Sequence, residues 1–276
     1  MIHNVKVFER MRSFLFGFLL VIGFALLGSR SFAVITREDS DIILNRLQEL
    51  YQREASLLHA ELRILSRWAD SRVQASARKL IDGTFWVVNV YGGLPRHQLT
   101  TTHSFTLAVC HELGHFFGGL PYSGINLYPS EGQADYWGAL KCLKKYLLLY
   151  PSERVVDVEL PSNVRQKCHT IYNSSSEEEQ ICLRVALSGY QLAQMFLSIK
   201  EENNRIDFST PDPLVVSQTN YSSYPSTQCR LDSYLAAALC PMDPYIDVSD
   251  DDWERGVCDL EMFPMGVRPA CWFHAK

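Results

Sequence analysis

The stretch Ser104-Phe-Thr-Leu-Ala-Val-Cys-His-Glu-Leu-Gly-His-Phe-Phe117 decides how the rest of the chain is interpreted. Gly118-Gly119 and a proline shortly afterwards are typical of a helix end, so we expect a helix over about residues 104–117. His111 and His115 are one turn apart on the same face of that helix, so both imidazoles can reach one ion. Glu112 lies next to this face and can contact a water on the ion without binding the ion itself. The spacing therefore predicts a zinc site.

A catalytic zinc site needs a third protein ligand and an open position for water. A third histidine would complete one common pattern, but Pro121 occupies that position, so this solution is excluded. The other solution is a glutamate on a later helix, and Glu131-Gly-Gln-Ala-Asp135 begins the next expected helix. Glu131 can bind the metal while Asp135, four residues on and on the same face, accepts a hydrogen bond from a ligand histidine. The alternative for this pair is a favourable acidic first turn of a helix.

The remaining sequence predicts a mainly helical α+β fold with a small sheet around these two helices. Ser40 can cap a long helix that continues to about residue 80, with apolar residues at helical spacing. The β-branched and aromatic run Thr84–Tyr91 indicates a strand. We expect either an ordinary buried strand or an edge strand that binds extended substrate beside the metal helix. The expected helices cover residues 40–80, 104–117, 130–148, 180–200 and 227–239.

The first 33 residues are typical of a targeting signal. A basic start precedes an apolar run over residues 13–27, and Ser31-Phe-Ala33 offers small residues for cleavage. The run is shorter than the roughly 20 residues of a spanning helix, which favours a cleaved signal over an uncleaved anchor. We therefore expect a signal peptide over residues 1–33 and a single domain over residues 34–276, with no stable membrane span after cleavage.

The cysteines agree with export. All eight follow the expected signal, and an even number suggests up to four disulfides in an oxidising compartment. Cys229–Cys240 and Cys258–Cys271 are the preferred pairs because they are local in sequence. Cys110 is about 100° round the helix from His111, so it is not expected to bind the metal. The predicted location is the periplasm or the exterior of the cell.

Composition excludes one class of partner. The chain has 276 residues, of which 47% are hydrophobic and 21% are charged, as in an ordinary globular protein. Its formal net charge of -5 argues against nucleic acid, because phosphate binding requires a basic face. A peptide or protein substrate is the expected partner instead.

The motifs resemble a known group of metallopeptidases. His111-Glu-Leu-Gly-His115 followed by Glu131-x-x-Ala-Asp135-x-x-Gly138 is similar to the soluble catalytic core of the CAAX-prenyl-protease and HtpX-like gluzincins. Those enzymes also have a His-Pro-x-x-x-x-Arg element near the zinc, where this chain has Tyr224-Pro-Ser-Thr-Gln-Cys-Arg230. The resemblance covers three motifs and about 120 residues. It implies a zincin-like core stabilised here by disulfides; the membrane helices and the substrates of that group do not carry over.

The substitution of tyrosine for histidine bears on catalysis. A peptidase of this kind uses a donor for the developing oxyanion. Tyr224 can supply a phenolic donor, and Arg230 can supply a guanidinium or orient its neighbours. Equally, Tyr224 can be a loop aromatic while Arg230 pairs with Asp135 or Asp232 for structural reasons.

Together these observations predict an exported zinc endopeptidase that holds one Zn²⁺ on His111, His115 and Glu131. In this interpretation Glu112 acts as general base for the zinc-activated water, with Tyr224 and Arg230 as further catalytic residues. The alternative is an envelope binding protein that binds zinc but has no catalytic activity.

Overall fold

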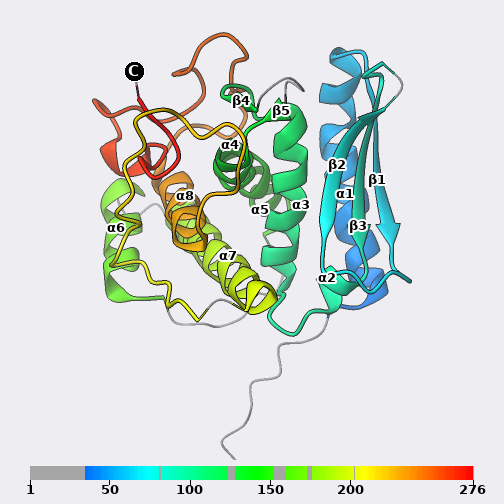
Figure 1. The fold of residues 1–276 in the computed structure, drawn as a ribbon, viewed down its shortest axis with the longest axis horizontal. Coiled ribbons are helices and arrows are strands. Elements are labelled where there is room, and N and C mark those ends of the chain that lie inside the picture. Colours follow the sequence, from blue (N-terminus) through cyan, green and yellow to red (C-terminus); the bar gives the residue numbers. More distant parts are fainter. Residues whose placement is uncertain are drawn as a thin grey trace, which may run out of the picture. The chain divides into compact units, whose positions relative to one another are not determined.

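The computed structural model describes residues 35–80, 82–123, 128–151, 160–172, 176–201 and 203–275. These residues belong to one unit, which extends from residue 32 to residue 276. The expected signal over residues 1–33 lies outside the described ranges. Within them, no helix is both long enough and apolar enough to cross a membrane. The described part is a mainly helical α+β structure with a small sheet (Figure 1).

The N-terminal part of the unit is a three-stranded sheet with a helix packed on it. Helix α1 (Arg37–Leu57) begins at a capping box in which Thr36 and Asp39 bond each other's backbone N–H groups. It is followed by β1 (Glu61–Arg67), β2 (Ala75–Leu80) and β3 (Phe85–Tyr91). The sheet order is β1-β3-β2, with β1 parallel and β2 antiparallel to β3.

The prediction of one helix over residues 40–80 is wrong beyond Leu57. The chain turns at Leu58 and His59, the latter with a left-handed φ of 58° that a helix cannot continue through. From there Leu62 and Ile64 are buried on alternate positions, which is the period of a strand. Leu62 and Ile64 therefore form the inner face of β1, whereas the helical spacing of apolar residues is confined to α1.

The strand expected over Thr84–Tyr91 is present as β3, but it is the central strand and not an edge. The edge-strand interpretation is therefore wrong for β3, and the buried-strand interpretation is confirmed. The sheet edge next to the helix that carries His111 and His115 is instead β2, which contacts this helix, α3 (Thr102–Phe117) (Figure 1). The sequence of β2 is polar and charged, so its strand character was not apparent.

The second half is helical. The expected helix over residues 130–148 is a continuous helical run that includes one π-helical segment, η2, and the helix expected over residues 180–200 begins earlier, at Ser176. Helices α7 and α8 pack extensively against each other, and α4 packs between α3 and α8. The remaining elements are α2 (Gly93–Arg96), β4 (Tyr122–Ser123), β5 (Tyr128–Pro129), α4 (Glu131–Trp137), η2 (Gly138–Leu143), α5 (Lys144–Leu149), α6 (Ser162–Tyr172), α7 (Ser176–Lys200), α8 (Thr227–Leu239) and the 3-10 turn η3 (Pro264–Gly266).

All eight cysteines form disulfides: Cys110–Cys142, Cys168–Cys182, Cys229–Cys271 and Cys240–Cys258. The two local pairs expected from the sequence are wrong. Cys229 and Cys240 are eleven residues apart on and just after α8, which separates their Cα atoms by about 16 Å. A disulfide needs Cα atoms within about 7 Å. Each end of α8 is therefore bonded to a different part of the tail.

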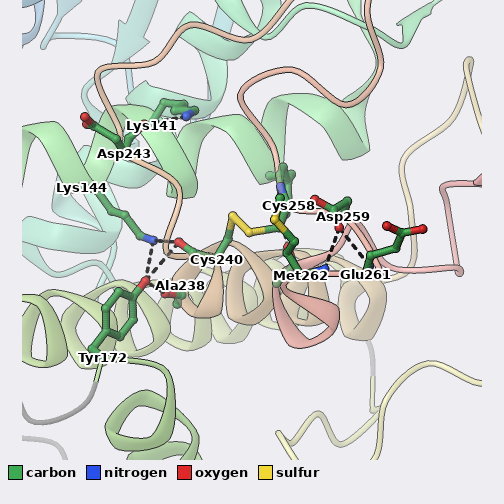
Figure 2. The surroundings of a disulfide bond; sticks show 12 residues. Lys141, Lys144, Tyr172, Ala238, Cys240, Asp243, Cys258, Asp259, Glu261 and Met262 are labelled. Carbon is green, nitrogen blue, oxygen red and sulfur yellow. Dashed lines mark hydrogen bonds between the residues drawn. A yellow bond between two sulfur atoms is a disulfide. The ribbon is translucent and has the colours of Figure 1, made fainter.

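Two buried lysines lie near one of these disulfides. Figure 2 shows the Cys240–Cys258 bond with Lys141 and Lys144 nearby. The Lys144 ammonium nitrogen lies 2.6 Å from the Cys240 carbonyl oxygen, and the Tyr172 hydroxyl donates to the same oxygen at 3.0 Å. Burial, and then the neighbouring Lys141, lower the pKa of Lys144 to about 7. The lysine amine thus fixes the chain just after α8 from inside the protein.

Candidate metal centre

Two helices that approach very closely form the centre. Helix α3 starts at a capping box between Thr101 and Ser104 and is buried along most of its length. A Cβ atom at Gly114 would lie only 2.8 Å from the Ala134 carbonyl oxygen on α4. Only glycine therefore allows α3 to pass this close to α4, and the Cys110–Cys142 disulfide joins the same region of α3 to η2.

The close crossing brings together the three residues that the motifs predict as ligands. The Nε2 atom of His111 lies 3.2 Å from an Oε2 oxygen of Glu131, and the Nε2 atom of His115 lies 3.7 Å from the same oxygen. One ligand atom from each residue can be chosen so that all lie within 4.8 Å of one another. Among the described residues this is the one such group of three, and it can hold a metal ion.

Hydrogen bonds orient both histidines for metal binding. The Nδ1 atom of His111 lies 2.8 Å from an Asp135 carboxylate oxygen, and the Nδ1 atom of His115 lies 3.0 Å from the Pro129 carbonyl oxygen. Both partners are acceptors, so each Nδ1 carries a proton and each Nε2 is the atom that would bind a metal ion. The two Nε2 atoms converge on the buried Oε2 oxygen of Glu131. Three electron-rich atoms meeting in a buried place require a cation or a proton between them.

Asp135 is the centre of a buried network. Its carboxylate accepts hydrogen bonds from two guanidinium nitrogens of Arg230, each at 2.7 Å. The Tyr234 hydroxyl donates a further bond to it at 2.6 Å. Asp135 and Tyr234 are 0% exposed and Arg230 is 4% exposed. Because these bonds compensate the buried charge, Asp135 stays ionised and its pKa lies well below the usual range. The ionised carboxylate then fixes the ring of His111.

Burial and neighbouring charges give the two histidines different pKa values. Burial lowers the pKa of His111, but Asp135 and Glu131 outweigh burial and raise the value to about 10. Burial, and then the nearby His111, lower the pKa of His115 to about 4. In the metal-free protein His111 therefore holds the proton that lies opposite Glu131, and His115 is neutral. A metal ion bound by this group would replace that single proton.

Glu112 lies beside the ligands and against the sheet edge. It lines a cavity together with His111, Tyr224 and Arg230. Burial, the largest influence, raises the pKa of Glu112 to about 7, and a backbone hydrogen bond from Ala77 on β2 partly offsets this rise. A carboxylate with a pKa near 7 is suited to accept and return a proton at neutral pH.

The two further residues predicted as catalytic have different environments. Tyr224 is 61% exposed and lines the cavity next to Glu112. Burial of its hydroxyl, followed by the charges of Glu131 and Glu112, raises the pKa of Tyr224 far above its usual range, so the phenol keeps its proton. Arg230 is covered by the Phe196 ring at 4.0 Å and its guanidinium is bonded to Asp135. It pairs with Asp135 and not with Asp232.

Three groups at the centre were missed from the sequence. The Pro129 carbonyl and the Ala77 N–H are backbone groups, which no residue pattern identifies. Tyr234 could have been found, because it is four residues after Arg230 on an expected helix and so shares its face. Comparisons with family models, curated proteins and solved structures give no match for this chain. The metal centre therefore rests on its own geometry.

Proposed function

We propose that this protein is an exported zinc endopeptidase with a zincin-like core formed by α3, α4 and the sheet. The observation that carries the proposal is the convergence of two Nε2 lone pairs and the Glu131 carboxylate, with Glu112 directly beside them. The four disulfides support an oxidising compartment outside the cytoplasm.

The ligand set favours zinc over harder ions. Magnesium and calcium prefer all-oxygen sites, whereas two imidazoles and one carboxylate are the ligand set of several zinc hydrolases. A bound zinc ion supplies a Lewis acid that activates water and polarises a carbonyl group. His111 and His115 would hold it through Nε2, and Glu131 would hold it through a carboxylate oxygen.

The chain's own groups account for proton transfer. Glu112 accepts the proton of the attacking water and returns it to the departing amine, for which a pKa near 7 is appropriate. Tyr224 keeps its phenolic proton and can donate a hydrogen bond to the developing oxyanion. Arg230 acts indirectly, because it keeps Asp135 ionised and Asp135 in turn orients His111. Arg230 is therefore proposed as a positioning residue.

The start of the outer edge of β2, at Ala75, suits an extended peptide. Residues two apart on a strand direct their backbone groups to the same side. The Ala77 N–H points to Glu112 and the Lys79 N–H points to the Tyr128 hydroxyl at 2.7 Å, so both positions face away from β3. Ala75 faces the same way, and its N–H makes no hydrogen bond to the described residues on that side. We propose that substrate pairs with Ala75 as an added strand.

Metal analysis and a peptide digest test the proposal. Mature protein should contain one zinc ion per chain and cleave members of a mixed peptide library. Glu112→Gln should keep zinc and lose cleavage, whereas Glu131→Ala should lose zinc. The exposed Glu177→Gln serves as the matched control and should change neither. Full zinc occupancy without any cleavage would favour a catalytically inactive envelope binding protein, and a protein without zinc would refute the metal assignment.

A further inference from the structure

A cavity continues from the metal centre into an apolar slot between α7 and the start of β2. Its volume is about 230 Å³, and one end is formed by His111 and Glu112. The slot therefore begins where the proposed chemistry takes place. A side chain next to the reacting bond can therefore enter it.

One wall of the slot is a single face of α7. It consists of Leu192, Met195, Phe196 and Ile199, which follow the i, i+3, i+4, i+7 spacing of one helical face. Leu192 and Met195 are 1% and 2% exposed, whereas Ile199 at the mouth is 43% exposed. The wall is thus rigid inside and accessible at its opening.

The slot has apolar lining outside α7 as well. Besides the residues of α7, its apolar lining includes Leu94, Ala108, Val73 and Ala75. Of the charged groups, Arg230 is held by Asp135 and Lys200 lies at the mouth beyond Ile199. An apolar pocket with polar groups at one end is the usual form of a specificity site.

The position of the slot along β2 indicates which substrate residue enters it. Glu112 lies next to Ala77, whereas the slot is lined by Val73, Gln74 and Ala75, which precede Ala77 in the chain. An added strand is somewhat more stable when it runs antiparallel to its neighbour. An antiparallel substrate passes Ala77 first and Ala75 afterwards, so the residue after the cleaved bond faces the slot.

We infer that the slot selects a large apolar side chain, such as leucine or phenylalanine, at the residue directly after the cleaved bond. This inference rests on the proposed peptidase function. In a mixed peptide library, cleavage before leucine or phenylalanine should exceed cleavage before glycine by about tenfold or more. The reason is that each methylene buried in an apolar pocket raises kcat/KM for that substrate about tenfold or more. Mass spectrometry of the products identifies the residue on each side of the cut.

Variants at the mouth test the slot without disturbing the core. Ile199→Asp should lower the leucine-to-glycine preference about tenfold and favour lysine or arginine at the same position. Ile246→Asp is the matched control, because Ile246 is also 43% exposed and does not line the slot. Ala108→Leu, which fills the slot, should shift the preference toward alanine and glycine.

A binding measurement separates the slot from catalysis. Peptide hydroxamates attach to zinc directly and can carry an isobutyl group or no side chain next to the hydroxamate. Calorimetry should show that the isobutyl compound binds zinc-loaded protein at least about tenfold more tightly, and that Ile199→Asp removes this advantage.

The outcomes distinguish the two proposals. Equal binding of both hydroxamates, or a preference at the residue before the cut, overturns the slot assignment while the peptidase proposal stands. Slot-dependent hydroxamate binding by a zinc protein that cleaves no peptide supports the slot and overturns the peptidase. A protein that binds no zinc overturns both.

Discussion

Replacing Asp135 by asparagine is the sharpest test of how the metal centre is built. The side chain keeps its shape but loses its charge. In the folded protein Asp135 receives bonds from His111, Tyr234 and two nitrogens of Arg230, and it is 0% exposed. Asparagine cannot neutralise the buried guanidinium, and its amide group cannot accept all four bonds.

Two separate losses follow from this geometry. Removing one partner of a buried ion pair costs about 3–5 kcal/mol, so the free energy of unfolding of the metal-free protein should fall by that amount. The ring of His111 also loses its fixed orientation and its basicity. Loss of such a partner weakens metal affinity by about 10–100-fold.

Urea unfolding in the presence of a chelator measures the first loss, and competition with a fluorescent zinc chelator at pH 7 measures the second. Asp232→Asn on α8 is the matched control. Burial already raises the pKa of Asp232, so neutralising it removes no favourable charge. Asp232 accepts bonds from the Asp212 N–H and from Gln228, whereas Arg230 and His111 bond to Asp135.

A double variant separates the two losses. Asp135→Asn combined with Arg230→Met removes both charges, so part of the lost stability should return while zinc affinity stays low. Wild-type zinc affinity in Asp135→Asn would refute the reasoning, because the carboxylate would then not orient His111. A stability loss below about 1 kcal/mol would show that the Arg230 charge is compensated elsewhere.

Three further expectations can be measured by similar means. Replacing Cys110 and Cys142 together by alanine should lower the free energy of unfolding by about 3–4 kcal/mol, since their bond spans 32 residues; a change below about 1 kcal/mol in urea unfolding would contradict this. Burial makes Lys144 release its proton near pH 7 in the folded protein but near 10.5 when unfolded, so the unfolded state binds more protons between these values and stability rises with pH there. Lys144→Met should reduce that slope by up to about 1.4 kcal/mol per pH unit in chemical unfolding at pH 8 to 10, and an unchanged slope would show that Lys144 is charged in the fold. Tyr128→Phe leaves the Lys79 N–H without its acceptor and should cost about 0.5–1.5 kcal/mol, with no loss of zinc; a stabilised variant would exclude this bond.

Local patterns were sufficient for the elements that have strong end signals. The helix ending at Gly118-Gly119 and the helix over Thr227–Leu239 lie where the sequence places them. Strand β3 was recognised from its β-branched and aromatic residues. Strand β2 was not, because an edge strand with one solvent-facing side carries polar residues that also fit a helix.

The disulfides show where distance along the chain misleads. Cys229 and Cys271 are bonded across 42 residues, because the tail returns to the start of α8. Closeness in sequence indicates a disulfide only when no rigid helix holds the two cysteines apart. Here α8 holds Cys229 and Cys240 apart, and the packing of the tail decides each partner.

By itself, the sequence determined the two helix faces and which side chains on them could hold a metal ion: helical periodicity alone places His111 beside His115 and Glu131 beside Asp135. Only the tertiary structure decided that these faces meet, because their contact depends on Gly114 fitting against the α4 backbone. It also decided that Arg230 is bound to Asp135 and that β2, not β3, forms the edge beside Glu112. Such choices depend on long-range packing and on the compensation of buried charge, and neither leaves a periodic signal in the chain.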